Sequence, residues 1–532
     1  MEKGVKSGFT GIMLNEENIA AFCVDGEIVP CGGASIYGGE AKPILIDSRE
    51  GRKMVRRTFA FVFCAAARRV FKDRLILAGQ PVEDAFYWTF IDGARPSAED
   101  FAKLEDALNS IIQENQPIHV KKIRVKEAAP VFRKQGMEDA AKSIENSGES
   151  AVEICEYGGF FEIYRNPLLE RTGALPPFVL RPYHEGFLLI TDCSKKEAYN
   201  KPPSKIFLER EKYKNWNEIC GVRAARDLNA ITTAGSRELG DFIQLNEVYA
   251  DGFFSRAALK IHEKRNDVRI ALLAGPSSSG KTTSAKRLCL HLRTLGLKPV
   301  IVSLDDYYLP PDKVPKDEDG RQDFERPEAL DVDYLNGQVL DLLAGKKIVA
   351  PKFDFKTGTR REGAVIQLKK DSILLLEGIH ALNNRIAEAA ADDKKYKIYV
   401  SAFTQIRLDE HSRVPSGDNR LLRRIVRDNQ FRGSSAGKTL EMWPSVQRGE
   451  KLHIFHFQNT ADFIINSALE YEIGVLRLYA GPLLRTVPVD SPQRGEAVRL
   501  LRLLNNFSSI SPQHVPGGSL LREFIGGGDF KY

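Results

Sequence analysis

The chain has 532 residues, of which 42% are hydrophobic and 28% charged, and its formal net charge is +6. One core does not ordinarily serve a chain of this length, so we expect two to four domains of an ordinary globular type. The small positive charge argues against a nucleic-acid binder, whose basic residues would form a dense patch.

No stretch of the sequence predicts a membrane span or a secretory signal. The longest apolar candidate, FAFVFCAAARRVF, is interrupted by Arg68 and Arg69, whereas a spanning helix needs about 20 apolar residues. The seven cysteines form no CxxC pair, which is typical of reduced thiols, so we expect a cytoplasmic protein. His453 and His456 lack a matching set of metal ligands and are interpreted as core or surface residues.

The first half of the chain predicts three regions. Residues 1–50 combine glycines with short apolar runs, which favours a small β-rich module. Residues 51–200 mix helix-like stretches such as AEDFAKLEDALNSIIQ with strand-like ones such as GFLLITD, a pattern typical of an α+β domain. Residues 201–265 carry apolar residues at helical spacing and predict a helical connection.

Residues 266–480 predict an α/β domain, followed by a C-terminal extension over 481–532. The runs VRIALLA, KPVIVSL, SILLLEG and KIYVSA read as strands, and KTTSAKRLCLHLRTLG reads as a helix that stops at Gly296. Continuous apolar strands that alternate with helices indicate a parallel sheet covered by helices on both faces. Ligands of such sheets bind beyond the carboxyl ends of the strands, so residues that follow each strand become candidates for the site.

The segment GPSSSGKT follows the first of these strands and opens a helix, which is the context of a phosphate-binding P-loop. Glycines at both ends permit a tight loop whose N–H groups point at phosphate oxygens, and the helix N-terminus adds partial positive charge. Lys281 supplies a charge to the outer phosphates, and Thr282 offers a hydroxyl to Mg²⁺. A chance Gly/Ser turn is the alternative, which both flanks disfavour. The predicted ATP-binding residues of the loop are Gly275, Pro276, Ser277, Ser278, Ser279, Gly280, Lys281, Thr282 and Thr283.

Carboxylates follow two other strands. Asp305 and Asp306 come after KPVIVSL, and Glu377 ends SILLLE. An acceptor hydroxyl loses its proton as a phosphoryl group arrives, so a carboxylate there can take the proton. Glu377, beside the P-loop, suits a direct or water-bridged magnesium ligand. The same residues would also suit a structural pair or the magnesium set of a simple ATPase.

The segment RLLRRIVRDNQFRG predicts an arginine-rich helix, with Arg432 in the following turn. Guanidinium groups bind phosphoryl oxygens bidentately and supply the positive charge that their transfer needs. The segment therefore indicates a hinged lid over ATP, and a solvated basic helix is the alternative.

Six segments, GPSSSGKTT, LDDYY, DFERPEALD, PKFDFKTGTR, LLLEGI and RRIVRDNQFRG, occur in the order typical of the uridine kinase and phosphoribulokinase family. Residues 266–480 therefore resemble that family. The resemblance implies a kinase that uses ATP and Mg²⁺, acts on a small-molecule alcohol and is often multimeric.

The resemblance also implies roles for individual residues. Asp305 corresponds to the catalytic base, Glu377 to the magnesium-linked glutamate beside Thr282, and Glu325 to the acidic residue that grips the ribose hydroxyls. Lys281 and the lid arginines would balance charge in the transition state. Those lid arginines are Arg424, Arg427 and Arg432. Arg427 is expected to be catalytic, and both Arg427 and Arg432 are expected to bind ATP. The implied acceptor site consists of Asp305, Tyr308, Glu325, Phe353, Phe355, Arg360 and Arg424.

The sequence departs from the family at the positions that read the base. Uridine kinases use the tyrosine and histidine of PxYDFxxHxR, which are Phe353 and Gly358 here, while Arg360 keeps its place and Ser434 replaces a second lid arginine. A site without these polar groups loses its main basis for selecting uracil or cytosine. The acceptor is therefore expected to be a nucleoside or another polyol or sugar.

The front of the chain resembles another family. RTFAFVFCAAARRVFKD, VEDAFYWTF and GGFFEIYRNPLLERTG are similar to the editing domain of threonyl-tRNA synthetases, and residues 1–50 resemble the TGS module before it. The synthetase's metal-binding positions are Arg57, Phe61, Tyr164 and Leu168 here. None can replace an imidazole or a thiol, so we expect this domain to lack zinc and deacylase activity. The whole arrangement is similar to bacterial uridine kinase-like nucleoside kinases.

An RNA-associated NTPase or regulator is the alternative from a different functional class. It rests on the synthetase-like front alone, and fold analogy is weak support for a function. Residues 1–200 contain no dense Lys/Arg tract, and the chain has no NKxD segment that would indicate a GTPase switch.

Overall fold

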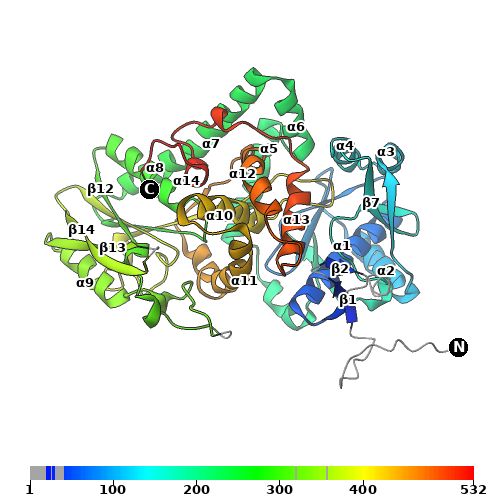
Figure 1. Cartoon of the computed structure of the whole chain (residues 1–532), viewed down its shortest axis with the longest axis horizontal. Helices are drawn as coiled ribbons and strands as arrows, with labels where there is room; N and C mark the ends of the chain where they lie inside the picture. Colours follow the sequence, from blue (N-terminus) through cyan, green and yellow to red (C-terminus); the bar gives the residue numbers. More distant parts are fainter. Residues whose placement is uncertain (1–18, 25–26, 30–40, 318–319, 355–356, 532) are drawn as a thin grey trace. The chain divides into compact units, whose positions relative to one another are not determined.

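The computed structural model describes residues 19–24, 27–29, 41–317, 320–354 and 357–531 (Figure 1). The chain divides into two compact units. The first consists of Met1–Pro202 with Pro488–Gly495, and the second consists of Pro203–Val487 with Glu496–Tyr532. No helix in the described part of the chain is long and apolar enough to cross a membrane.

The first unit contains helices and antiparallel strands. In chain order they are β1 (Ile19–Val24), β2 (Glu27–Val29), β3 (Ala41–Leu45), α1 (Arg49–Val70), β4 (Ile76–Ala78), β5 (Phe86–Phe90), α2 (Ala98–Glu114), β6 (His119–Arg124), α3 (Val125–Lys134), α4 (Glu138–Glu145), β7 (Ala151–Tyr157), β8 (Phe160–Ile163), β9 (Val179–Tyr183) and β10 (Gly186–Ile190).

Three sheets build this unit, with strand orders β2-β1-β3, β4-β5-β10-β9 and β6-β7-β8. The apolar stretch within α1 is buried in the unit's core, where Phe63 stacks on Trp88 with ring centroids 5.1 Å apart. Residues 51–200 thus contain both helices and antiparallel strands. Strands β1 to β3 fall within residues 1–50, and the remainder of that expected β-rich module lies largely outside the described residues.

The second unit carries the P-loop segment. Its elements are α5 (Lys205–Cys220), α6 (Ala225–Ala234), α7 (Ser236–Glu263), β11 (Ile270–Ala274), α8 (Lys281–Thr294), β12 (Lys298–Ser303), α9 (Val332–Leu343), β13 (Lys347–Asp354), β14 (Thr359–Gln367), β15 (Ser372–Glu377), β16 (Lys395–Ser401), α10 (Ser416–Arg432), α11 (Ala436–His453), β17 (Phe463–Asn466), α12 (Glu472–Arg485), α13 (Arg494–Leu504) and α14 (Arg522–Ile525).

A parallel sheet of order β12-β15-β11-β16-β17 forms the centre of this unit. Strands β11 and β15 are buried along their whole length, as their continuous apolar sequences predict. The register sets Glu377 opposite both Ser303 and Leu273, so the ends of β15, β12 and β11 meet at one edge. The parallel sheet expected from the sequence is confirmed. Strand β17 and the β13–β14 hairpin were not predicted.

Helices α5, α6 and α7 occupy the segment 201–265 that was expected to be a helical connection. They belong to the same compact unit as the sheet. The reason is their apolar surface: Trp216 of α5 stacks on Tyr249 of α7 at 3.8 Å, and Phe253 and Phe254 are buried in the core that the sheet shares. Residues 496–532 of the expected C-terminal extension also pack into this unit.

Candidate functional site

The P-loop joins the carboxyl end of β11 to α8. A Cβ atom on Gly275 would lie 2.0 Å from the Val400 carbonyl oxygen, so only glycine allows this approach. Ser278 and Gly280 have positive φ angles of 57° and 82°, which turn the chain into the first turn of α8, where Thr282 lies. The Lys281 ammonium donates to the Pro276 carbonyl at 3.1 Å, so the side chain folds back along the loop. This is the backbone that a phosphate-binding loop requires.

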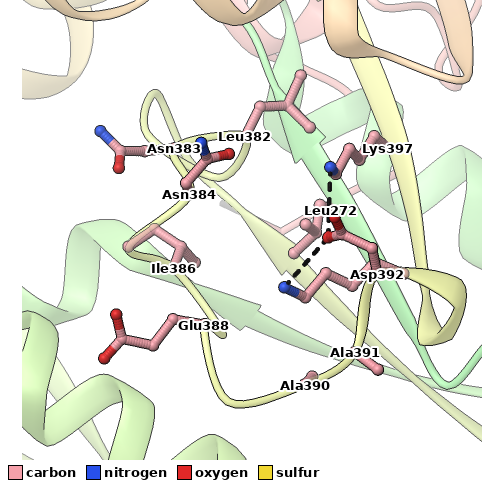
Figure 2. Close-up of a pocket in the computed structure, with 11 residues that line it drawn as sticks. Leu272, Leu382, Asn383, Asn384, Ile386, Glu388, Ala390, Ala391, Asp392 and Lys397 are labelled. Carbon is pink, nitrogen blue, oxygen red and sulfur yellow. Dashed lines mark ion pairs between the residues drawn. The ribbon is translucent and has the colours of Figure 1, made fainter.

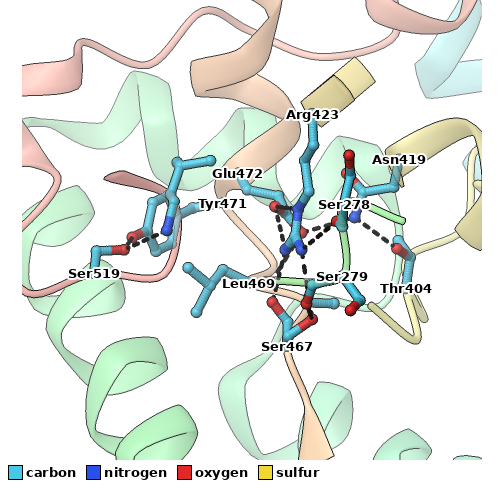
Figure 3. Close-up of polar contacts among 12 residues, drawn as sticks. Ser278, Ser279, Thr404, Asn419, Arg423, Ser467, Leu469, Tyr471, Glu472 and Ser519 are labelled. Carbon is cyan, nitrogen blue, oxygen red and sulfur yellow. Dashed lines mark hydrogen bonds and ion pairs between the residues drawn. The ribbon is translucent and has the colours of Figure 1, made fainter. Parts of the chain in front are cut away.

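Two arginines of α10 bind carbonyl groups of the loop, and Figure 3 shows one of them, Arg423. Arg423 is 0% exposed, pairs with Glu472 at 2.7 Å and reaches the Ser278 carbonyl at 3.4 Å. Arg420 pairs with Glu450 at 2.8 Å and donates to the Ser277 carbonyl at 3.0 Å. Buried ion pairs of this kind exclude the alternative of a solvated basic helix.

The three remaining arginines of α10 gather around one carboxylate, Asp428. Arg424 lies 3.2 Å from it, Arg427 2.8 Å and Arg432 3.7 Å. Arg424 also donates to the Ser277 hydroxyl at 2.6 Å, which links the group to the loop. The positive charge of Arg427, with burial, lowers the pKa of Arg432 to about 10. Three guanidinium groups that share one carboxylate leave net positive charge suited to phosphate oxygens.

The expected position of Arg432 needs a correction, because Arg432 is the last residue of α10 and does not lie in the turn after it. The helix continues to the glycine at 433, which adopts the left-handed conformation that commonly ends helices. Asp428 was not singled out from the sequence, although it lies within the arginine-rich segment.

Glu377 occupies the end of β15, between the strand of the P-loop and the strand that leads to Asp305. It is 5% exposed and accepts a hydrogen bond from the Ser303 hydroxyl at 3.0 Å. Burial raises the pKa of Glu377 to about 7; the negative charge of Asp305 adds to the rise and Lys281 opposes it. A divalent cation would favour the ionised form of such a carboxylate, so Glu377 and the Thr282 hydroxyl fit a magnesium site.

The two adjacent aspartates after β12 have different surroundings. Asp306 accepts a hydrogen bond from the Phe353 N–H at 3.2 Å and pairs with Lys352 at 3.2 Å, so it is bound to β13. Asp305 acts through its charge on Glu377 and on Arg432. Asp305 thus lies near enough to Glu377 and Arg432 for its charge to act on both.

Glu325 reaches the same region from the loop before α9. Burial raises the pKa of Glu325 to about 7, against the charges of Arg424 and Lys281, and its buried Oε2 atom makes no hydrogen bond to a described residue. A Cβ atom on Gly449 would lie 2.3 Å from the Glu325 Cβ, so α11 packs directly on this residue. Glu325 thus lies beside the P-loop lysine with acceptor capacity left for a ligand.

Two of the three aromatic residues expected at the acceptor site, Tyr308 and Phe353, belong to the core. Phe353 is 6% exposed, and its ring centroid lies 5.9 Å from that of Tyr308. Tyr308 is buried too and donates to the Phe324 carbonyl at 3.2 Å. Little of the Phe353 face is open to a ligand, which limits its capacity for stacking. Phe355 lies outside the described residues.

Two further positions of the PKFDFKTGTR segment have contacts that explain their residue types. Gly358 has φ +67°, and a Cβ atom there would lie 2.7 Å from the Pro311 side chain, so a histidine does not fit. Arg360 pairs with Asp331 at 3.0 Å and lies over the Tyr334 ring, contacts that bind the hairpin to α9.

Three residues near the site were not predicted. His380, three residues after Glu377, is buried, and burial lowers its pKa to about 3, so the ring is neutral. Glu450 accepts from the Ser277 N–H at 2.9 Å, and Glu523 accepts from the Thr283 N–H at 2.9 Å. The two glutamates lie 173 and 240 positions from their partners, so no local pattern indicates them.

A separate cavity of about 380 Å³ lies elsewhere in the unit (Figure 2). It is lined by residues of β11, of the start of β16 and of the chain between β15 and β16, and Asp392 pairs there with Lys395 and Lys397. None of the predicted site residues lines it. The candidate site is therefore the carboxyl edge of the sheet.

Part of this chain is similar to known proteins. The model of the Phosphoribulokinase / Uridine kinase family matches residues 270–473. A uridine kinase of Staphylococcus aureus (strain JH9) is 31% identical over 176 residues, which cover 33% of this chain and 76% of that protein. A solved structure described as a possible uridine kinase from Bacillus stearothermophilus covers 40% of this chain and 98% of its own, with 16% identity and a TM-score of 0.27.

Proposed function

Because the chain belongs to the phosphoribulokinase/uridine kinase family, we propose that it is an ATP-dependent kinase that phosphorylates a hydroxyl of a small molecule. The acceptor that its motifs favour is a nucleoside, at the 5′-hydroxyl. One observation carries the proposal: buried Glu377 lies between the P-loop strand and the strand of Asp305, with the charges of both Asp305 and Lys281 acting on it. We place this activity in residues 266–480.

In the proposed reaction the loop N–H groups and Lys281 hold the donor phosphates. Thr282 and Glu377 would hold Mg²⁺, which would neutralise phosphate charge when bound. Asp305 accepts the proton of the acceptor hydroxyl as that oxygen attacks the γ-phosphorus, and the bond to the leaving ADP oxygen breaks. Arg424, Arg427 and Arg432 stabilise the charge on the transferring group. The protein supplies position and charge, the two terms that dominate phosphoryl transfer.

The residues expected to bind the acceptor are better suited to a ligand's hydroxyl groups than to a nucleobase. Glu325 has a buried oxygen without a partner among the described residues, which would accept from ribose or other vicinal hydroxyls. Because Phe353 is buried and position 358 cannot hold a histidine, neither supplies a polar contact to a base. This observation favours a second candidate, a kinase of a non-nucleoside polyol or sugar.

For the first unit we propose a synthetase-like fold without editing chemistry. Phe61 packs on Phe160 with centroids 5.6 Å apart, and Leu168 packs on the same apolar core. Neither offers a metal ligand. An ion at this position would need the imidazole and thiol groups that the chain replaces.

The test is an ADP-release assay of the full chain with Mg·ATP and a panel of acceptors. The panel holds uridine, cytidine, other nucleosides, ribose-like sugars, inositols, ribulose phosphate and, separately, RNA. We expect one class of small alcohols to stimulate ADP release and to be phosphorylated. Stimulation by sugars or inositols but by no nucleoside would establish the second candidate. Stimulation by RNA alone would refute the kinase proposal.

A further inference from the structure

The segment Ser519–Ile525 covers the phosphate end of α8. Glu523, in the short helix α14, accepts hydrogen bonds from the Thr283 N–H at 2.9 Å and from the Thr283 hydroxyl at 2.7 Å. Glu523 is only 9% exposed. The N-terminus of the helix after a P-loop is where donor phosphates bind, because its N–H groups and dipole attract anions. A carboxylate of the protein itself occupies that position.

Several contacts hold the segment against the loop. The Ser519 hydroxyl lies 3.2 Å from the Tyr471 hydroxyl (Figure 3). A methyl group of Leu520 lies 3.5 Å from where a Cβ atom on Gly280 would be. The Arg423 guanidinium, which fastens the loop from α10, lies over the Phe524 ring at 5.0 Å. Leu520 and Phe524 are fully buried, so the segment is packed onto the loop and α10 as part of the core.

A second carboxylate holds the other end of the loop, but under different conditions. Glu450 accepts from the Ser277 N–H and is matched by the buried guanidinium of Arg420. Both hydrogen bonds of Glu523 come from Thr283. Glu450 therefore belongs to a neutralised pair within the fold, whereas Glu523 takes a place that an anion would otherwise fill.

On the basis of the proposed kinase function, we infer that the segment Ser519–Ile525 is an autoinhibitory element of the nucleotide site. The Glu523 carboxylate and an inner phosphate of a nucleoside triphosphate cannot both accept from Thr283, and their like charges repel at close range. Donor binding therefore requires the segment to leave the loop. The apparent affinity for the nucleotide is reduced by the fraction of molecules in which the segment is displaced.

The first test measures the binding of a fluorescent ATP analogue with Mg²⁺ to the full chain and to three variants. Glu523→Gln and Glu523→Ala remove the charge, and Asp529→Asn is the matched control, an exposed acid of the same C-terminal region. We expect both Glu523 variants to bind about tenfold more tightly, and the control to bind within about twofold of the parent protein. Unchanged or weaker binding in both Glu523 variants would overturn the inference, as would the absence of nucleotide binding in every protein.

A second test needs no substitution. Hydrogen exchange of residues 519–525 in the unaltered chain should become faster when Mg·ATP is added, because the segment leaves the loop. Slower exchange would show that the segment closes over the nucleotide and would overturn the inference. The two proposals fail separately: tighter binding in Glu523 variants that phosphorylate no acceptor would leave the autoinhibition standing and remove the kinase.

Discussion

Asp305 and Asp306 are neighbours in the chain, yet their carboxylates have different partners. The 3₁₀ helix Leu304–Tyr307 separates the two side chains directly after β12. Asp306 is bound to the Phe353 N–H and to Lys352, which ties it to the hairpin. Asp305 acts on Glu377, in the region that would hold the metal. A single peptide unit thus separates a carboxylate with a structural partner from the one that we propose accepts the proton.

Substitution of the two aspartates should separate these roles. Asp305→Asn removes the proton acceptor, so kcat should fall by about 10²–10⁴-fold while the affinity for ATP stays within about twofold. Asp306→Asn keeps an acceptor for the Phe353 N–H and should lower kcat by less than about tenfold. Steady-state kinetics with the identified acceptor and a nucleotide-binding assay provide both numbers. Equal losses in the two variants would remove Asp305 as the base.

The arginines of helix α10 fall into two sets with different partners. Arg420 and Arg423 are buried in ion pairs that hold the back of the P-loop. Arg424, Arg427 and Arg432 share the carboxylate of Asp428 and supply positive charge to the site. The helix therefore positions the loop with one set of arginines, and we propose that the other set contacts the phosphates, so the two sets should respond differently to substitution.

The contrast is testable with one arginine from each set. Arg423→Met leaves Glu472 buried without its partner, which should lower the free energy of unfolding by about 3–5 kcal/mol. Arg427→Met should change it by less than about 1 kcal/mol, because Asp428 keeps two other arginines. Turnover should nevertheless fall by about 100-fold or more in Arg427→Met. Denaturant unfolding would measure the stabilities, and initial rates would measure turnover. An Arg423→Met protein that is stable and active would contradict the division of the arginines into two sets.

The larger unit is held together by contacts between distant segments of the chain. Glu470, just before α12, has its N–H bound to Asn246 of α7 and its side chain to Asn217 of α5. It is buried beside Glu472, and burial with that second negative charge raises the pKa of Glu470 to about 8. Helices that precede the sheet thus meet, at Glu470, the segment that leads into the helix that follows it.

This carboxyl group makes stability depend on pH. Its folded pKa of about 8 exceeds the ordinary value of 4.5, so the folded state binds a proton that the unfolded state lacks between those values. The resulting stabilisation is present below pH 4.5 and is lost as pH rises through about 8. Glu470→Gln should unfold like the parent protein near pH 5 and should be roughly 3–5 kcal/mol more stable near pH 9.

Thermal and denaturant unfolding at both pH values would measure the difference. Glu263→Gln is a control, because Glu263 forms an exposed pair with Lys260 and should show no such pH dependence. A parent protein whose stability relative to Glu470→Gln does not change with pH would contradict the raised pKa.

Local sequence signals were sufficient to predict the strands β11, β12, β15 and β16, the helix α8 and the P-loop. Each depends on residues that are close in the chain: an apolar run, a glycine turn, a helix stop. Because parallel strands end at one edge, the positions of Asp305 and Glu377 near the loop also followed from the sequence. Their strand-end positions indicated proton transfer and magnesium binding, and the choice of Asp305 over Asp306 came from family resemblance.

Partners that lie far apart in the chain could be known only once it had folded. The burial of Phe353, the pairing of Arg423 with Glu472, and the contacts of Glu450 and Glu523 with the P-loop all join segments separated by tens to hundreds of residues. Periodicity reports which face of an element is apolar, but not which side chain of another element will meet it. Hydrogen bonds and ion pairs depend on that meeting in space, and here it determines whether the nucleotide site is open or covered.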